Sequence, residues 1–567
     1  MTKKWVFGEN LPDEQIHELS KTLNISRGIA SILIRRGIVD FQTAKNFFRP
    51  DLTQLHDPFL MKDLDKAVNR LSDAIFAGEK ILIYGDYDVD GTTSVSLIYG
   101  FLKEFSETLS YYIPDRYKEG YGISEQGVRH AHEMGATVMI ALDCGIRAVG
   151  QAQLARSLGI DLIICDHHLP GDQLPDAYAI LDPKRADCAY PFKELSGCGV
   201  GFKLLQGFCQ QNTIELHKLF RHLDLLAVSI ASDIVPIVGE NRILAFYGLK
   251  RLNTAPSIGL KALIEVGVLK QKLNITNVVF GIGPRINAAG RIGHAKMAVD
   301  LLVSENPEEA RAIAAEVNQH NTERKDLDKS MTEEALAMIA ANQEGAQPHT
   351  TVLFKPDWHK GVIGIVASRC IEKYYRPTII LTASNDVITG SARSVSGFDI
   401  HSAIAACEDT LMQYGGHKYA AGLSMAPAQL QPFRDKFEEV VSERIQEEHL
   451  CPQLKVDAEV SLSELSFKFH DVLDQMSPFG PANMKPLFVS RGLLPKGTPR
   501  LLKEAHIKMQ LIDPVTDKQI DAIAFGFGDL YDDLLQAASL DIAFHLDVNE
   551  YMGNSSLQLM IKDIKLN

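Results

Sequence analysis

The chain has few cysteines for its length, and none of them is arranged as a metal or redox motif. Its 567 residues include 8 cysteines, and no two of them form a CxxC pair. Paired spacings mark zinc sites and redox-active disulfides, so neither is predicted here. Several cysteines lie within apolar stretches, which indicates reduced thiols in the core of a cytoplasmic protein.

Long apolar runs and an excess of positive charge are also missing. No run of about 18 apolar residues occurs, as a membrane-spanning helix would need. The first ten residues contain lysines but no apolar core after them, so no secretory signal is expected. The formal net charge of −14 argues against a protein that coats nucleic acid through bulk positive charge. Nucleic acid bound in a local basic groove, helped by metal ions, remains compatible with this charge.

What the sequence does contain is a series of short apolar runs that alternate with amphipathic helical stretches. Three of these runs cover residues 81–85, 138–142 and 161–165. Such runs are typical of parallel strands that are buried on both faces of a sheet. The predicted fold class is therefore α/β, with a parallel sheet. A chain of this length exceeds one hydrophobic core and should divide into about three or four domains.

The predicted domain organisation follows changes in the pattern along the chain. Between Asn306 and Gly345 nothing breaks a helix, and Pro307 suits the first helical position. The middle of this helix is polar, which indicates a bridge between domains rather than a core helix. The predicted parts are an N-terminal helical segment (1–75), a parallel-sheet domain (76–304), the long connecting helix (305–347), a second α/β domain (348–450) and a small β-barrel (451–567).

Acidic residues and histidines stand directly after each of the three apolar runs. Because the carboxyl ends of parallel strands form one rim of a sheet, these side chains should meet there. Crowded negative charges repel one another unless a cation neutralises them, so a hard-metal site for two ions is predicted. The residues are Asp86, Asp88 and Asp90 after the first run, Asp143 after the second, and Asp166, His167 and His168 after the third.

The main alternative for the first acidic cluster is a calcium-binding EF-hand loop. That loop requires a bidentate Glu at its twelfth position. Counted from Asp86, the twelfth residue is Leu97, and the cluster follows a strand rather than a helix, which excludes an EF-hand. A surface acidic turn is another alternative, although several acids on a buried strand tip are costly without a partner. Neutral, hydrogen-bonded imidazoles are the usual alternative for the histidines.

Further motifs follow the first three in a fixed order along the chain. The matching stretches are residues 86–91, 142–145, 166–168, 231–236, 283–291, 358–369, 390–394 and 415–422. Each motif alone is weak, but together they resemble the DHH phosphoesterases, and within them the RecJ-type single-strand-specific exonucleases. The resemblance covers nearly the whole chain. It implies a DHH domain, a DHHA1 domain and a C-terminal OB-fold barrel that binds nucleic acid.

This resemblance implies a function and the components it requires. The implied function is a single-stranded-DNA-specific 5′-to-3′ exonuclease that releases mononucleotides by two-metal-ion hydrolysis, in DNA recombination and repair. The implied cofactors are Mn²⁺ or Mg²⁺, and an imidazole ligand shifts the preference towards Mn²⁺. The implied partners are single-stranded DNA, single-strand-binding protein and a helicase. The protein is expected to be a cytoplasmic monomer without membrane attachment.

The resemblance also assigns roles to individual residues. His168 is expected to contact the scissile phosphate or assist the leaving group, and Asp90 is a second catalytic candidate. The expected metal ligands are Asp86, Asp88, Asp143, His167 and Asp233. The expected phosphate- and DNA-binding set is Arg116, Arg285, Ser391, Arg393, Gly415, Gly416 and His417.

Two other classes of function remain open at this point. The first is a DHH enzyme for a small substrate, such as a nanooligonucleotide, a cyclic dinucleotide or pyrophosphate. The terminal barrel argues against it, because such an enzyme would not need one. The second is a non-catalytic DNA-binding relative that has lost its metals, and the presence of every matched ligand argues against that class.

Overall fold

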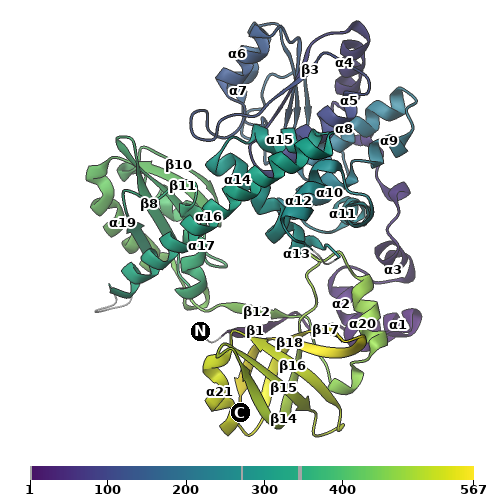
Figure 1. Ribbon diagram of the computed structural model, residues 1–567, viewed down its shortest axis with the longest axis vertical. Helices are drawn as coiled ribbons and strands as arrows, with labels where there is room; N and C mark the ends of the chain where they lie inside the picture. Colours follow the sequence, from purple (N-terminus) through teal and green to yellow (C-terminus); the bar gives the residue numbers. More distant parts are fainter. Residues whose placement is uncertain (1–2, 270–271, 342–347) are drawn as a thin grey trace. The chain divides into compact units, whose positions relative to one another are not determined.

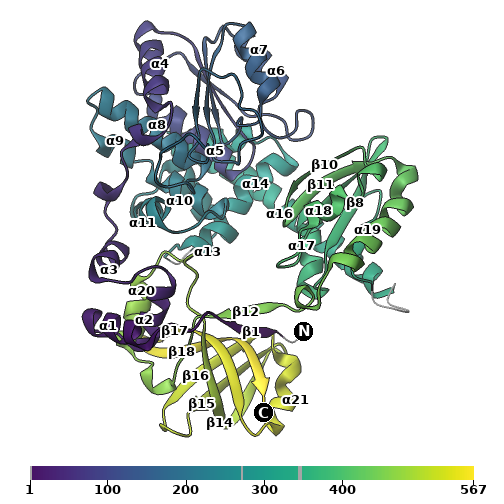
Figure 2. The same ribbon diagram turned by 180° about the vertical axis from the view of Figure 1, so that it is seen from behind.

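In the computed structural model, which describes residues 3–269, 272–341 and 348–567, the chain forms two compact units. The larger unit comprises Gly8–His320 and Val456–Asn567, and the smaller unit comprises Met1–Phe7 and Asn321–Lys455. Figure 1 and Figure 2 show the elements of both units from opposite sides. Among the described residues, no helix has both the length and the apolar character that crossing a membrane requires.

The larger unit contains a five-stranded parallel sheet in the order β3-β2-β4-β5-β6. The direction of winding changes between β2 and β4, because β3 lies on the opposite side of β2. In open sheets of this kind, ligands bind outside the carboxyl ends of the strands at such a switch point. The strands are β2 (Ile81–Gly85), β3 (Leu109–Tyr112), β4 (Val138–Leu142), β5 (Asp161–Cys165) and β6 (Ala179–Leu181).

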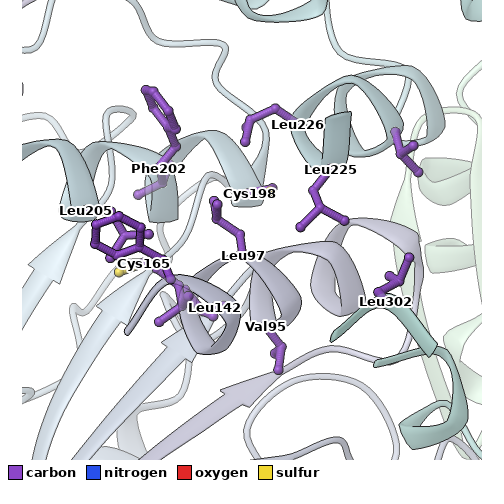
Figure 3. Packing of buried hydrophobic residues seen from close by; sticks show 14 of the residues in the cluster. Val95, Leu97, Leu142, Cys165, Cys198, Phe202, Leu205, Leu225, Leu226 and Leu302 are labelled. Carbon is purple, nitrogen blue, oxygen red and sulfur yellow. The ribbon is translucent and has the colours of Figure 1, made fainter. Parts of the chain in front are cut away.

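Helices cover both faces of this sheet, which explains why its central strands β2, β4 and β5 are continuous apolar runs. Neighbouring residues of β2 such as Ile83 and Tyr84 pack into different hydrophobic clusters. Figure 3 shows part of the first cluster, to which Leu97, Leu142 and Phe202 belong. Helices α4 (Leu64–Ala77), α5 (Val89–Leu102) and α8 (Gly197–Gln211) line one face, and α6 (Glu125–Glu133) and α7 (Val149–Ser157) line the other.

A group of helices extends this domain beyond the sheet and leads to the long helix α16. Helix α10 is buried from Leu223 to Ala231 and ends at Ser232, directly before Asp233, one of the predicted ligands. Helix α16 begins at Pro307 as predicted, whereas its predicted end at Gly345 lies outside the described residues. The helices are α9 (Leu216–Phe220), α10 (Leu223–Ser232), α11 (Gly239–Thr254), α12 (Ile258–Val266), α13 (Ile275–Asn277), α14 (Gly283–Ile292), α15 (Lys296–Val303) and α16 (Pro307–Ala341).

The smaller unit is built around a mixed sheet in the order β10-β11-β9-β8-β7. Only the pairing of β7 with β8 is parallel. Its strands are β7 (Thr351–Phe354), β8 (Thr378–Ser384), β9 (Val387–Arg393), β10 (Gln413–His417) and β11 (Ala420–Met425), and its helices are α17 (Ile363–Lys373), α18 (Ile400–Ala405) and α19 (Leu430–Arg444).

The C-terminal part of the larger unit is a β-barrel with longer strands than predicted. It is closed by antiparallel pairing of β14 with β17. Its elements are β13 (Ala458–Glu459), α20 (Phe467–Gln475), β14 (Phe488–Leu502), β15 (His506–Ile512), β16 (Gln519–Phe525), α21 (Tyr531–Gln536), β17 (Leu540–Tyr551) and β18 (Asn554–Leu566). The N-terminal helices α1 (Asp13–Leu23), α2 (Arg27–Arg35) and α3 (Phe41–Phe48) contribute residues to the core of this barrel.

The N-terminal segment differs from the helical stretch predicted over residues 1–75. Its first element is the strand β1 (Lys4–Phe7), which pairs with β12 (Gln453–Val456); β1 and residues 453–455 of β12 belong to the smaller unit. A strand of four residues with a single buried side chain, Trp5, is too short to show a period of two. In addition, α4 packs on the parallel sheet instead of belonging to the N-terminal segment. The division between the units falls after Lys455 rather than at the predicted residue 451.

The guanidinium of Arg242 joins three parts of the larger unit. It lies on α11, is 4% exposed, and donates hydrogen bonds of 2.9–3.3 Å to four backbone carbonyls. One acceptor is Phe47 at the end of α3, and the others are Met476, Ser477 and Pro478 beyond α20. Arg242 thus fixes the sheet domain to the N-terminal helices and to the barrel.

Replacing Arg242 with alanine should lower the free energy of unfolding by about 2–5 kcal/mol, because buried carbonyls would lose their donors. Urea unfolding followed by circular dichroism measures this change. Lys250→Ala, at an exposed position of the same helix, should change stability by less than about 0.5 kcal/mol. Equal stability of the two variants would contradict the proposed bridging role.

Candidate metal centre

The predicted strand-end residues converge at the carboxyl edge of the parallel sheet. Nε2 of His167 lies 3.2 Å from Oδ1 of Asp143 and 3.6 Å from Oδ2 of Asp233. The same nitrogen lies 3.9 Å from Oδ2 of Asp90. His167 follows β5, Asp143 follows β4, Asp233 follows α10, and Asp90 lies in the first turn of α5. Segments far apart in the sequence therefore share one site. His167, Asp143 and Asp90 are buried, whereas Asp233 is partly exposed.

Several polar atoms of this cluster are buried without a hydrogen-bond partner. They are both carboxylate oxygens of Asp86, Oδ1 of Asp143 and both ring nitrogens of His167. A buried polar group without a partner costs about 1–3 kcal/mol, so a cluster of them indicates a missing ligand. Carboxylate oxygens suit Mg²⁺ or Mn²⁺, and an imidazole nitrogen suits transition metals. The donor set therefore fits a divalent cation.

The acids of this cluster resist ionisation in the absence of a cation. Burial raises the pKa of Asp143 well above its usual range, and the charges of Asp90 and Asp88 raise it further. Burial and then Asp88 also raise the pKa of Asp86 well above its usual range. Burial, followed by the charge of Asp90, raises the pKa of Asp233 to about 9. A bound divalent cation would favour the ionised carboxylates and remove this repulsion.

The acidic turn after β2 depends on the local backbone. Asp88 caps α5, because its Oδ1 accepts a hydrogen bond of 3.0 Å from the backbone N–H of Gly91. A Cβ atom at Gly91 would lie 2.3 Å from the carbonyl oxygen of Asp86, which no real contact permits. Asp143 has a φ of 59°, a left-handed conformation that aspartate adopts more readily than most residues. The close approach at Gly91 thus fixes the backbone of Asp86, and the N-cap of α5 fixes Asp88.

Asp90 is tied into the surrounding helices. Its carboxylate accepts hydrogen bonds from the backbone N–H groups of Gly197 (2.7 Å) and Cys198 (2.9 Å) at the start of α8. The hydroxyl of Ser229 on α10 donates a third bond of 2.7 Å. A carboxylate in this position is stabilised by the helix N-terminus and joins α5, α8 and α10 beneath the site. The catalytic role predicted for Asp90 stays a prediction, and these contacts favour a positioning role.

His168 is oriented by the carboxylate of Asp166. Nδ1 of His168 lies 2.7 Å from Oδ1 of Asp166, whose other oxygen accepts a bond from the N–H of Ile146. Burial lowers the pKa of His168, but the hydrogen bond and charge of Asp166 outweigh it, so the pKa is raised. The side chain of His168 is 42% exposed, whereas that of His167 is 7% exposed. His168 is therefore the histidine that a substrate can reach, and it favours its protonated form.

The two predicted arginines of the larger unit differ in their surroundings. The guanidinium of Arg116 lies 4.8 Å from the ring centroid of Tyr87, beside the acidic turn. Arg285 is 9% exposed, and its Nε donates a hydrogen bond of 2.9 Å to Asn318 on α16. Arg285 also donates to the carbonyl oxygen of Gly281. The structure therefore brings Arg116 to the metal centre, while Arg285 connects α14 to α16, and its phosphate contact stays a prediction.

The remaining predicted residues lie on neighbouring strands of the smaller unit. Ser391 and Gly415 both pair with Gly422, from opposite sides of β11. The guanidinium of Arg393 donates a hydrogen bond of 3.0 Å to the hydroxyl of Ser391. A Cβ atom at Gly415 would meet nothing within 4 Å, so the backbone there is open to a ligand. By the alternation along the strands, Ser391, Arg393, Gly415 and His417 thus lie on one face of this sheet, and Gly416 is the backbone link between Gly415 and His417.

The structure adds two residues that the sequence analysis did not name. Asp182 directly follows β6, is fully buried, and has one carboxylate oxygen without a partner. Burial raises the pKa of Asp182 to about 7. The hydroxyl of Tyr121 lies 3.1 Å from Nε2 of His168. The three-residue apolar run before Asp182 is too short to predict a strand, and Tyr121 lies in a loop without a periodic pattern.

Comparison with protein-family models gives three matches in order along the chain. The DHH family N-terminal domain matches residues 80–230, the DHHA1 domain matches residues 347–443, and the RecJ OB domain matches residues 456–563. The predicted fold class is therefore confirmed: an α/β protein with a parallel-sheet DHH domain, a DHHA1 domain and a C-terminal OB fold.

Comparison with individual proteins gives matches along most of the chain. The chain is 38% identical to the single-stranded-DNA-specific exonuclease RecJ of Bacillus subtilis, over 97% of this chain and 70% of the relative. Its structure is similar to that of RecJ in complex with Mn²⁺ from Thermus thermophilus, with a TM-score of 0.85 and 27% identity, over 100% of this chain and 80% of the other. The Mg²⁺ complex of that protein gives a TM-score of 0.79 and 26% identity, over 100% and 78% of the two chains.

Proposed function

Because this chain belongs to the RecJ family of single-stranded-DNA-specific exonucleases, we propose that it hydrolyses single-stranded DNA from the 5′ end and releases mononucleotides. The observation that supports this proposal best is the cluster of buried, unpartnered atoms of Asp86, Asp143 and His167 at the carboxyl edge of the sheet. These atoms are the donors that a phosphodiesterase with divalent ions requires.

The chemistry follows from the donors and from the exposed residues around them. Two divalent ions supply an activated water and stabilise the departing oxygen of a phosphodiester when they are bound. The residues that would hold Mn²⁺ or Mg²⁺ are Asp86, Asp88, Asp143, His167 and Asp233.

His168 and Arg116 would act on the substrate itself. Asp166 fixes the ring of His168 and stabilises its protonated form, so Nε2 can donate a proton to the leaving oxygen. The guanidinium of Arg116 lies close enough to the acidic turn for its charge to act on Asp86, so it can pair with an oxygen of a phosphate bound there. Neither residue belongs to the proposed ligand set, so each can contact a phosphate while all the proposed ligands remain bound to the metal ions.

An exonuclease assay with labelled ends tests this function. Single strands labelled at the 5′ or 3′ end are incubated with Mn²⁺, with Mg²⁺ or with a chelator. We expect early release of labelled mononucleotide from the 5′-labelled strand, and no release with chelator. Early release from the 3′-labelled strand would refute the polarity. Hydrolysis of a dinucleotide but not of a long strand would identify a small-substrate phosphodiesterase instead.

The DHHA1 residue Arg393 provides a test of how the 5′ end is held. A guanidinium can bind a terminal phosphate through two parallel hydrogen bonds. Arg393→Ala should therefore reduce kcat/KM on 5′-phosphorylated strands about 10-fold more than on 5′-hydroxyl strands. Arg369→Ala, on α17 of the same unit, serves as the matched control, since its side chain is 50% exposed. Equal losses on both kinds of end would indicate general backbone binding.

We also propose the cellular setting that the resemblance implies. The protein would be a cytoplasmic monomer that acts in DNA recombination and repair, with single-strand-binding protein and a helicase as partners. Sedimentation of the purified chain tests the monomeric state. Degradation of strands coated with single-strand-binding protein, compared with bare strands, tests the first partner.

A further inference from the structure

The loop between β3 and α6, residues 113–124, carries side chains that face the candidate metal centre. Arg116 lies over the ring of Tyr87, and the hydroxyl of Tyr121 lies 3.1 Å from Nε2 of His168. Tyr117 donates a hydrogen bond of 2.6 Å to the carbonyl oxygen of Arg291 on α14. Tyr121 is 57% exposed, so burial alone does not hold it in this position. Polar contacts therefore contribute to the order of the loop.

One carboxylate joins both ends of this loop. Oε1 of Glu119 accepts a hydrogen bond of 2.7 Å from the N–H of Asp115, at the start of the loop. Oε2 of Glu119 accepts a bond of 2.6 Å from the hydroxyl of Ser124, at its end. The hydroxyl of Tyr112 on β3 lies 3.1 Å from both oxygens. Glu119 thus closes the loop and ties it to the edge strand of the sheet.

The partners of Glu119 are themselves fixed to rigid elements. Ser124 is the N-cap of α6, since its hydroxyl accepts a bond of 2.8 Å from the N–H of Gly127. The ring of Tyr112 stacks on that of Tyr84 at 5.6 Å, and the hydroxyl of Tyr84 donates to the carbonyl oxygen of Gly122. Glu119 is therefore connected to α6, β3 and β2, the strand that ends in the acidic turn.

The geometry points to Glu119 as a positioning residue that holds Arg116 and Tyr121 over the reacting phosphate of single-stranded DNA. This inference rests on the proposed function. Glu119 contacts neither the proposed metal ligands nor His168 directly, and its donors are neutral groups of the loop and its flanking elements. Its loss should release the loop while the metal centre stays intact. Misplacing substrate-contacting groups by about 1 Å costs about 100-fold in rate.

The test compares Glu119→Ala with Glu119→Gln and with Glu125→Ala as a matched control. Glu125 lies on α6 next to the loop, and its side chain is 65% exposed in a surface pair with Arg129. We expect Glu119→Ala to lower kcat/KM on single strands about 10- to 100-fold, with unchanged Mn²⁺ affinity by calorimetry. Glu119→Gln keeps an acceptor for Asp115 and should recover part of the loss. Glu125→Ala should match the wild-type chain.

Hydrogen exchange gives a readout that is independent of activity. The amides of Tyr117 and Lys118 donate to the side chain of Asp115, so an ordered loop protects them. Peptides that cover residues 113–124 should exchange faster in Glu119→Ala and at the wild-type rate in Glu125→Ala. In an Arg116→Ala/Tyr121→Phe background, adding Glu119→Ala should change kcat/KM less than about twofold, because the groups it positions are already gone.

Three results would overturn the inference. They are unchanged exchange of the loop in Glu119→Ala, faster exchange with normal kcat/KM, and a full additional loss in the Arg116→Ala/Tyr121→Phe background. Failure of the wild-type chain to degrade single strands would instead refute the proposed function. In that case the exchange comparison would still decide whether Glu119 orders the loop.

Discussion

Replacing Asp143 with alanine should reduce hydrolysis of single-stranded DNA by more than about 100-fold. Removing a residue that only supports a metal ligand already costs about 10- to 100-fold, and Asp143 is itself a proposed ligand. Asp143 belongs to the proposed ligand set, and its Oδ1 lies 3.2 Å from Nε2 of His167 but makes no hydrogen bond. Initial rates with saturating Mn²⁺ measure this loss. Retention of more than a few per cent of the activity would remove Asp143 from the metal centre.

The same variant should behave in the opposite way in stability measurements without metal. Wild-type protein gains stability from a bound ion, by about 2.7 kcal/mol at a hundredfold excess over Kd, so Mn²⁺ should raise its melting temperature. Asp143→Ala should not show that increase. In the presence of a chelator, however, its melting temperature should be no lower than that of the wild type, because the substitution removes a buried carboxyl group that the neighbouring acids repel. Asp172→Ala, an exposed acid on the loop after β5, should keep the full Mn²⁺ response.

Replacing His168 with alanine should lower kcat by about 100-fold while Mn²⁺ affinity stays within about twofold of wild type. His168 is exposed and held by Asp166, so its ring can reach a leaving oxygen without binding a metal. His167→Ala should show the reverse order of effects, with a large loss of Mn²⁺ affinity, because its ring faces Asp143 and Asp233. Calorimetric titration and single-turnover rates separate the two.

A comparable loss of Mn²⁺ affinity in both variants would make His168 a ligand as well. The two histidines are adjacent in the sequence and their rings lie 4.5 Å apart, so the assignment depends on which ring is buried. His168→Gln provides a further control, since the glutamine amide can still donate a hydrogen bond but cannot transfer a proton at neutral pH.

The part of the site that could be predicted from the sequence is the part carried by central strands. β2, β4 and β5 are buried on both faces, so each appears as an unbroken apolar run with an acid after it. β6 has three residues and gave no comparable signal, which is why Asp182 was not named. Asp233 follows a helix, and the sequence could place it only through the resemblance.

Contacts between distant segments could not be predicted in this way. The hydrogen bonds of Asp90 come from residues 107, 108 and 139 positions away, on helices whose packing no local pattern specifies. Arg285 lies in a glycine-rich motif that suggested phosphate binding, but α16 brings Asn318 against its guanidinium. The pairing of β1 with β12 likewise depends on residues more than 400 positions apart.

The shared core of the N-terminal helices and the barrel has a consequence for how the chain is made. Residues such as Ile29 and Leu33 are fully buried in one cluster with Phe488 and Phe544 of the barrel. During synthesis these helices leave the ribosome before the barrel is made. Their apolar faces therefore stay exposed to solvent until the barrel residues have been synthesised and folded. Removing the barrel alone would leave them permanently exposed and prone to aggregation. A truncation that avoids this exposure therefore has to remove the N-terminal helices and the barrel together.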